Sequence, residues 1–110
     1  MVDQDGPFSW SSLDAETAAR IHQRLSNLES MTWHEIFVAG RKQNHTVDIS
    51  SMSTEAQRRL EAIQPDDVDG LVSLRVTGKE RVWGIRREGH CYLLWWDQEH
   101  AVCPSKKKHT

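Results

Sequence analysis

The last third of the sequence gathers side chains that can bind phosphate and transfer protons. Arginine and lysine contact phosphate oxygens, exposed aromatic rings stack on unpaired bases, and imidazoles titrate near neutral pH. A site that cleaves RNA needs a group to activate the 2′-hydroxyl, cations to stabilise the phosphorane and an acid for the leaving oxygen. The residues suited to these roles are Arg75, Lys79, Arg81, Arg86, Arg87, His90, Tyr92, His100, Lys106, Lys107, Lys108 and His109. The other interpretation of the same residues is a solvated face of a sheet.

Charge is unevenly distributed along the chain, although the net charge is only −2 at neutral pH. Residues 1–70 hold 6 Lys or Arg against 12 Asp or Glu, a balance of −6. Residues 71–110 hold 8 against 4, a balance of +4. A basic surface attracts polyanions over a Debye length of roughly 8–10 Å. The asymmetry is therefore consistent with a polyanionic partner, and equally with an attraction between an acidic helical part and a basic sheet.

Metal and thiol chemistry have little support in the sequence. Metal-binding residue types recur between positions 90 and 103, but no Cys-x-x-Cys pair is present. His90 and Cys91 are neighbours, so they point to opposite faces of a strand. Cys91 also lies in an apolar run, where burial raises a thiol pKa and blunts its reactivity. No Gly-x-Ser-x-Gly motif or glycine-rich phosphate loop occurs. We therefore expect no metal, no cofactor, and buried free thiols.

Length and hydropathy favour a single cytoplasmic domain. One hundred and ten residues suffice for one hydrophobic core. No apolar run approaches the roughly 20 residues that a membrane helix needs. The first residues also lack the basic and apolar regions of a secretory signal. The sequence thus predicts a cytoplasmic protein with no membrane partner.

An antiparallel meander of three to four strands is predicted for residues 71–103. The β-rich runs 79–87 and 90–96 are separated by Glu88-Gly89, where glycine can take a positive φ at no steric cost. A second glycine-containing turn precedes the first of these runs. Residues 101–103 are expected to add a last short strand.

The run 90–96 is apolar at both odd and even positions. Alternation along a strand places Leu93 and Trp95 on one face and Trp96 on the other. Trp95 and Trp96 cannot both point inward from a one-sided sheet, so one of them needs a helix, a partner or a ligand on its face. A strand that is apolar on both faces is usually central. We therefore expect residues 90–96 in the middle of the sheet.

Helical patterns precede the sheet. Apolar residues recur at helical spacing over residues 13–28, with Ser11 or Ser12 as the expected cap. The residues before this helix, 1–10, are predicted to form an arm that packs back on the domain through its aromatic side chains.

Two shorter helices are predicted before the meander. Thr32 and Glu35 form a capping-box pattern that opens a short helix ended by Gly40. A further helix is predicted over residues 54–63, and residues 46–49 fit an extended segment or a short edge strand. The predicted class is α+β, with N-terminal helices packed on the C-terminal antiparallel sheet. Its parts are an arm (1–10), a helical part (11–70), the sheet (71–103) and a basic tail (104–110).

Three segments resemble the C-terminal sheet of RelE/ParE-type bacterial toxins. These are Leu74–Arg81, Val82–Arg86 and Tyr92–Asp97, followed by His100, and they span roughly 35 of the 110 residues. The family pattern is a leucine, a short glycine turn, an arginine-rich strand, a hydrophobic hairpin strand and a late histidine or arginine. The resemblance implies a small α+β fold with helices on one face of the sheet. It also implies a toxin that is held by an antitoxin and, in the RelE branch, cleaves mRNA on the ribosome.

The resemblance also implies roles for individual residues. Arg81 matches a strand arginine that contacts the phosphate, Arg86 or Arg87 matches a basic residue of the hairpin, and His100 matches the late histidine. With Tyr92 added, the predicted catalytic residues are Arg81, Arg86, Tyr92 and His100. The predicted nucleic-acid-binding residues are Arg75, Lys79, Arg87, His90, Lys106, Lys107 and Lys108. The expected partners are RNA or the ribosome and a cognate antitoxin.

A second interpretation is a non-catalytic binding or assembly module. Here the aromatic face formed by Trp83, Trp95 and Trp96 docks a protein partner or a second copy of the chain, giving a homodimer. Aromatic residues and arginine are enriched at binding hot spots, which is the reason for considering this class.

The lysine-rich tail generates a first prediction. Lys106–Lys108 follow Pro104 with no apolar residue to anchor them. Truncation after Ser105 should change the free energy of unfolding by no more than about 0.5 kcal/mol. It should weaken binding to single-stranded RNA and flatten the dependence of log affinity on log salt by roughly 0.7 per lysine lost. Thermal melting and RNA-binding isotherms at several salt concentrations check this. A large drop in melting temperature, or unaltered RNA binding, would contradict it.

Overall fold

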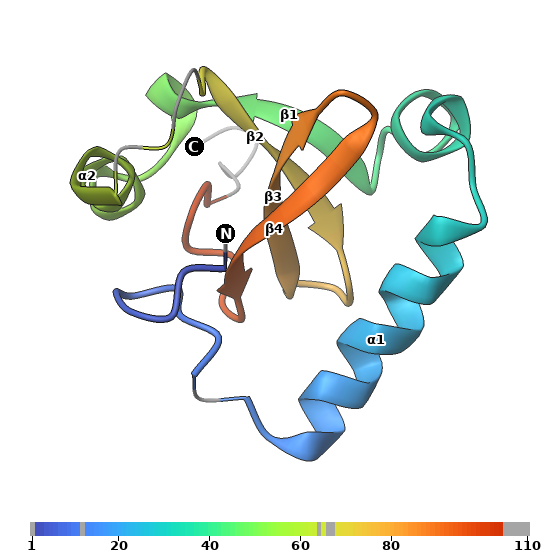
Figure 1. Cartoon of the computed structure of the whole chain (residues 1–110), viewed down its shortest axis with the longest axis horizontal. Coiled ribbons are helices and arrows are strands. Elements are labelled where there is room, and N and C mark those ends of the chain that lie inside the picture. Colours follow the sequence, from blue (N-terminus) through green and yellow to red (C-terminus); the bar gives the residue numbers. More distant parts are fainter. Residues whose placement is uncertain (1, 12, 64, 66–67, 105–110) are drawn as a thin grey trace, which may run out of the picture.

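The computed structural model describes residues 2–11, 13–63, 65 and 68–104. Helices are combined with a four-stranded antiparallel sheet, which confirms the predicted α+β class (Figure 1). The elements in chain order are α1 (Ala15–Glu29), the π-helix η1 (Glu35–Ala39), β1 (Asn44–Asp48), the 3-10 helix η2 (Ile49–Ser51), α2 (Thr54–Ile63), β2 (Gly70–Arg75), β3 (Arg81–Arg87) and β4 (His90–Asp97). Across these described ranges, no helix has the length and apolar character needed to traverse a membrane. The predicted contacts of Lys106–Lys108 and His109 lie outside the described residues.

The four strands follow one another across the sheet in chain order, β1-β2-β3-β4, and each neighbouring pair is antiparallel. β1 confirms that the segment around residues 46–49 includes an edge strand. Residues 101–103, which were expected to form a last strand, form a bend instead. The predicted meander therefore contains three strands, and β1 supplies the fourth.

β4 lies at an edge of the sheet, so the prediction that residues 90–96 occupy the middle is wrong. The outer edge of β4 is covered by the N-terminal arm, which runs beside it (Figure 1). The Asp3 amide donates to the Leu94 carbonyl at 3.0 Å, and the Trp96 amide donates to the Phe8 carbonyl at 3.1 Å. The backbone of the arm, whose sequence does not alternate as a strand does, thus provides hydrogen bonds to part of the edge of β4. The sequence pattern had predicted a neighbouring strand at this edge.

The two long helices lie on opposite sides of the sheet (Figure 1). On one side, which we call the α2 face, Leu60 of α2 belongs to the same core cluster as Trp95. On the other side, the α1 face, Ile21 of α1 belongs to the same cluster as Trp96. The resemblance implied helices on one face only. Here both faces are covered, which explains how consecutive tryptophans are both buried.

A β-bulge interrupts the pairing of β3 with β4. Trp83 is opposite Trp95, but the next residue, Gly84, is opposite Leu93, so Leu94 is the extra residue. As a result Leu93 packs in the cluster on the α1 face and Trp95 in the cluster on the α2 face. Simple alternation placed these two side chains on one face, and that prediction is wrong because nothing in the sequence marks the bulge.

Local capping fixes the starts of the helices. Asp14 caps α1, and its carboxylate accepts a hydrogen bond from the Thr17 amide at 2.7 Å. The caps predicted from the sequence were Ser11 or Ser12, and Ser12 lies outside the described residues. The predicted capping box is present. The Thr32 amide donates to Glu35 Oε1 at 2.8 Å, and the Glu35 amide donates to Thr32 Oγ1 at 3.2 Å.

The hairpin between β3 and β4 closes as predicted. Glu88 and Gly89 have φ values of 50° and 81°. Positive φ at both central residues matches a type I′ turn, whose twist suits two antiparallel strands.

The arm is anchored by a buried carboxylate. Asp3 is 8% exposed. It accepts hydrogen bonds from Arg59 Nε at 2.9 Å, from Arg59 NH2 at 2.7 Å and from Trp95 Nε1 at 2.9 Å. The hydrogen bond from Arg59 holds the pKa of the Asp3 carboxyl below its ordinary value of 3.8, against the opposing effect of burial. The ionised carboxylate therefore joins the arm, α2 and β4.

Replacement of Asp3 by Ala should destabilise the fold by about 1–3 kcal/mol, because the buried Trp95 indole loses its acceptor. The ionised Asp3 carboxylate stabilises the fold fully at pH values above 3.8, which is its ordinary pKa. This stabilisation is lost as the pH falls through the lower pKa that Asp3 has in the folded protein. Urea unfolding at several pH values measures both effects. Asp5→Ala, a change at an exposed position two residues away, is the control. Equal stability of wild type and Asp3→Ala at pH 7 would refute the anchoring role.

Candidate phosphate-binding site

A buried carboxylate fixes the turn that follows β4. Asp97 is 1% exposed. Its Oδ2 accepts from Trp83 Nε1 at 3.1 Å and from the Val102 amide at 3.0 Å, and its Oδ1 accepts from the Ala101 amide at 2.7 Å. These bonds hold the chain around His100, whose φ of 58° is uncommon for a residue other than glycine. The sequence suggested Asp97 only as one of several metal-ligand types, so this role was missed.

Two arginines from neighbouring strands converge on the β2–β3 turn, and one of them, Arg81, lies next to the turn after β4. Arg75, at the end of β2, is opposite Arg81, at the start of β3, and Arg81 is in turn opposite Asp97. Arg75 Nε and Arg81 NH1 both donate to the Thr77 carbonyl, at 3.3 Å and 3.0 Å. Among the described residues, neither guanidinium forms a salt bridge. Their positive charge is therefore available to a bound anion.

The charge of Arg75 acts on Arg81, and the charge of Arg81 acts on the histidine of the turn. Burial, followed by the charge of Arg75, lowers the pKa of Arg81. Burial, followed by the charge of Arg81, lowers the pKa of His100, and His45 of β1 adds to this effect while Asp97 opposes it. At neutral pH the His100 imidazole is therefore neutral and carries a lone pair that can accept a proton.

We call Arg75, Arg81, His100 and His45 the cationic cluster. His45 is opposite Ser73, which lies two residues before Arg75 on β2. Alternation along β2 therefore places His45 and Arg75 on the same face of the sheet, and Arg81 shares this face because it is opposite Arg75. His45 was not selected from the sequence, because its isolated position in a polar stretch gave no signal. Only the pairing of β1 with β2 brings it to this end of the sheet.

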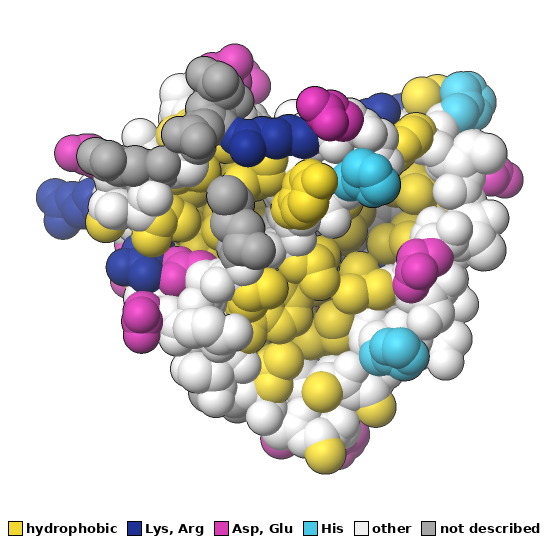
Figure 2. Space-filling view, in the orientation of Figure 1, with side chains coloured by type: hydrophobic (Ala, Val, Ile, Leu, Met, Phe, Trp, Pro, Cys, Tyr) yellow, Lys and Arg dark blue, Asp and Glu magenta, His cyan; other side chains and the backbone are white. Residues whose placement is uncertain are grey.

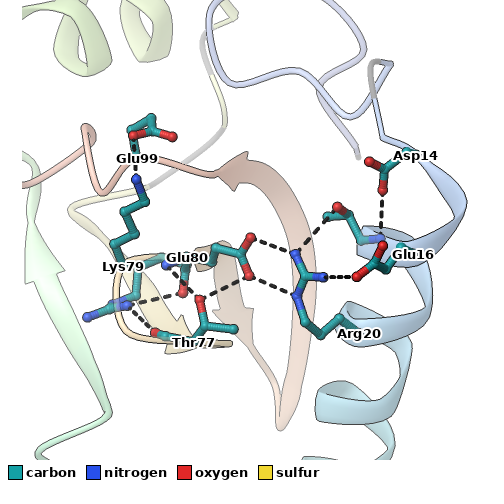
Figure 3. A network of polar contacts seen from close by, with 9 residues as sticks. Asp14, Glu16, Arg20, Thr77, Lys79, Glu80 and Glu99 are labelled. Carbon is teal, nitrogen blue, oxygen red and sulfur yellow. Dashed lines mark hydrogen bonds and ion pairs between the residues drawn. The ribbon is translucent and has the colours of Figure 1, made fainter.

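A polar network fixes the β2–β3 turn whose carbonyls hold the two arginines (Figure 3). Glu80 is 8% exposed and accepts from Arg20 Nε at 3.1 Å, Arg20 NH2 at 2.7 Å and Thr77 Oγ1 at 3.0 Å. The hydrogen bond from Arg20 holds the pKa of the Glu80 carboxyl below its ordinary range. Lys79 Nζ contacts Glu99 Oε1 at 2.9 Å, which joins this turn to the one after β4. Lys79 is thus paired with a carboxylate.

The remaining predicted site residues lie away from the cluster. Arg86 is on the α1 face, with its guanidinium carbon 4.2 Å from the ring centroid of Trp33. Tyr92 shares the face of Arg81 but pairs four residues further along β3, about 13 Å away at about 3.3 Å per residue. The ring of His90 lies 6.1 Å from that of Tyr92.

Arg87 ends β3 opposite His90, at the hairpin end of the sheet. The structure therefore places Arg81 beside both Arg75 and His100, and it places Arg87, His90 and Tyr92 at the other end. Of the four residues predicted to be catalytic, only Arg81 and His100 share a site.

The aromatic docking face considered from the sequence does not exist as such. Trp83, Trp95 and Trp96 are 1%, 0% and 6% exposed, so their side chains are core residues. They cannot contact a partner without unfolding, and the prediction that they form a docking surface is wrong.

Thiol and metal sites receive no geometric support. Cys91 and Cys103 are free and half-buried. Burial raises the pKa of the Cys91 thiol to about 11, so little thiolate forms at neutral pH. Within the ranges that the structure describes, no three His, Cys, Asp or Glu side chains are grouped so that they could hold a metal ion.

Comparison with known proteins adds no relative. The chain matches no family model, no curated protein and no solved structure. The resemblance to RelE/ParE toxins therefore stays a prediction that rests on the residues quoted for it.

The electrostatics of the cluster generate a prediction for His100. Its pKa, measured by an NMR titration of the imidazole, should lie below the ordinary value of 6.5. Arg81→Ala should raise this pKa, because one neighbouring positive charge is removed. The pKa should still remain below 6.5, because burial persists. Arg58→Ala, at an exposed position on α2, is the matched charge control and should leave the titration unaltered. An identical His100 pKa in wild type and Arg81→Ala would show that the two side chains do not interact.

Proposed function

We propose that the protein is an RNA-directed toxin of the RelE-like type, with endoribonuclease activity at the cationic cluster. The observation that carries this proposal is the position of Arg81, which is opposite Arg75 on the neighbouring strand and lies beside a neutral His100. Cations placed in this way favour the binding of a phosphate diester, and a neutral imidazole beside them can act as a general base. The resemblance of residues 74–100 to the sheet of that family supports the choice of RNA among polyanions.

The proposed reaction is transfer of the phosphoryl group to the neighbouring 2′-oxygen. His100 takes the proton of the ribose 2′-hydroxyl, and the 2′-oxygen attacks the adjacent phosphorus. Arg75 and Arg81 stabilise the negative charge that builds up on the phosphorane oxygens. The bond from phosphorus to the 5′-oxygen breaks, and that oxygen takes a proton, for which His45 is the candidate general acid. The products are a 2′,3′-cyclic phosphate and a 5′-hydroxyl.

Two partners belong to this proposal. The substrate is cytoplasmic RNA, and the family resemblance makes ribosome-bound mRNA the form to test first. The same resemblance makes a cognate antitoxin the expected inhibitor, since a nuclease of this kind would otherwise act on the transcripts of its own cell.

Substitutions at the cluster should separate RNA binding from cleavage. Arg75→Ala and Arg81→Ala should each weaken binding to a single-stranded RNA oligonucleotide roughly 10-fold, because each removes a charge-assisted contact to phosphate. Each should also reduce the slope of log affinity against log salt by about 0.7. His100→Gln should keep the affinity within a few-fold and slow cleavage by at least about 100-fold, as expected for loss of a general base. Binding isotherms and gel assays, with and without ribosomes, measure these effects.

Arg58→Ala is again the matched control, since it removes one exposed arginine of α2 that does not belong to the cluster, and it should change neither quantity. Induced expression in bacteria provides the cellular test, in which wild type should arrest growth and create new transcript ends, and Arg81→Ala should not. Normal growth and intact transcripts with a folded wild-type protein would rule out the toxin activity. Equal RNA affinity of wild type, Arg75→Ala and Arg81→Ala would rule out the phosphate site itself.

A further inference from the structure

An open apolar groove lies between α1, η1 and the β3–β4 hairpin, on the face of the sheet opposite the cationic cluster. Its volume is about 510 Å³. Figure 2 shows a broad hydrophobic surface hollowed into this side of the molecule. The apolar part of the lining includes Leu25, Leu28, Met31, Trp33, Phe37 and Leu93.

The walls of this groove are only half-buried. Leu25 of α1, Met31 and Trp33 before η1, Phe37 within it and Leu93 of β4 all pack against the core of the α1 face while keeping part of their surface in contact with solvent. A contiguous exposed apolar surface of this kind is more often an interaction site than a surface without a function. The groove is partly open to solvent, which suits the apolar stripe of a docked helix better than a small molecule that needs burial on all sides.

Charges of opposite sign flank the groove. The guanidinium of the exposed Arg86 lies over two rings of the lining, 4.2 Å from the ring centroid of Trp33 and 5.2 Å from that of Phe37. These two rings are stacked, with centroids 5.5 Å apart and an interplanar angle of 15°. On the α1 wall, Glu29 lines the groove. Among the described residues, neither Arg86 nor Glu29 takes part in a salt bridge.

We propose that the groove docks an amphipathic helix of a partner protein. The apolar stripe of that helix enters the groove between α1 and the hairpin, a carboxylate on one flank meets Arg86, and a basic residue on the other flank meets Glu29. Helices with this pattern bind apolar grooves through side chains at i, i+3, i+4 and i+7. The opposite charges of the walls set the direction of the helix, since charge complementarity fixes register and specificity.

Arg86 is suited to this role because the stacked rings already restrict it. A cation held over aromatic faces loses less conformational freedom when a carboxylate binds than a freely rotating side chain would. The inference goes beyond the proposed RNA function and does not depend on it, because the groove and the cationic cluster lie on opposite faces of the sheet.

A display library tests the proposal on the full chain. Its members are 18-residue helical peptides with Leu, Ile, Phe or Met along one stripe and Glu, Lys or Gln at random on both flanks. Selection should enrich Glu on one flank and Lys on the other, and the enriched peptides should bind with micromolar dissociation constants. Leu25→Asp should abolish binding. Arg86→Gln should weaken it at least fivefold and remove the preference for Glu on the first flank.

Two controls keep the outcome specific to the groove. Val38→Asp changes an apolar residue that is 49% exposed and outside the groove lining, so it should leave peptide binding unchanged. Arg81→Ala should also bind the peptides normally, whatever becomes of its RNA affinity. Thermal melting of each variant shows that it is folded.

Three results would overturn the proposal. The first is a selection that yields no peptide whose binding is lost in Leu25→Asp. The second is enrichment without any charge preference between the flanks, or with the preference unaltered in Arg86→Gln. The third is concentration-dependent self-association of the wild type, measured by sedimentation and abolished by Leu25→Asp, which would show that a second copy of the chain occupies the groove.

Discussion

The geometry of the cationic cluster depends on the carboxylate of Asp97. An ionised group removed from water costs several kcal/mol unless donors replace its hydration. Here an indole and two backbone amides do so, and they come from β3 and from the turn after β4. The same carboxylate therefore locks a tryptophan of the core, ends a strand and holds His100 in place. Because its lone pairs are engaged by these donors, Asp97 attracts the neighbouring cations from a distance without neutralising them in a direct ion pair.

The sheet acts as a partition between two surfaces with different chemistry. Its α2 face ends in arginine and histidine side chains, and its α1 face opens into an apolar groove. This separation depends on the bulge in β4, which lets Trp95 and Trp96 fill different cores while Leu93 stays beside the groove. An antiparallel sheet commonly leaves one face in water. Here helices on both faces bury most of it, and the charged groups are confined to its ends.

Local signals in the sequence were sufficient for much of the fold. The limits of α2, the Thr32–Glu35 capping box and the turn at Glu88-Gly89 depend on residues within a few positions of one another, and each was predicted. Alternation along β3 places Arg81 and Arg86 on opposite faces, although both were predicted to belong to one site. The covering of the outer edge of β4 could not be predicted in this way, because it depends on hydrogen bonds to an arm about ninety residues earlier. The same holds for the site: Arg81 and His100 were selected by type, but their partners Asp97 and His45 reach them only through tertiary pairing.

The arm beside β4 joins the two ends of the chain into a loop of nearly its full length. Closing a loop this long carries an entropic cost that grows with its size, so the arm docks late, after the residues between have already collapsed. During synthesis the arm leaves the ribosome before β4 and must wait for that strand to appear. Until the arm docks, the outer edge of β4 is an unpaired strand with an aromatic and aliphatic sequence, which is the kind of edge that recruits other chains. The few hydrogen bonds of the arm therefore determine how long a newly made chain remains prone to aggregation, a kinetic property that its melting temperature does not report.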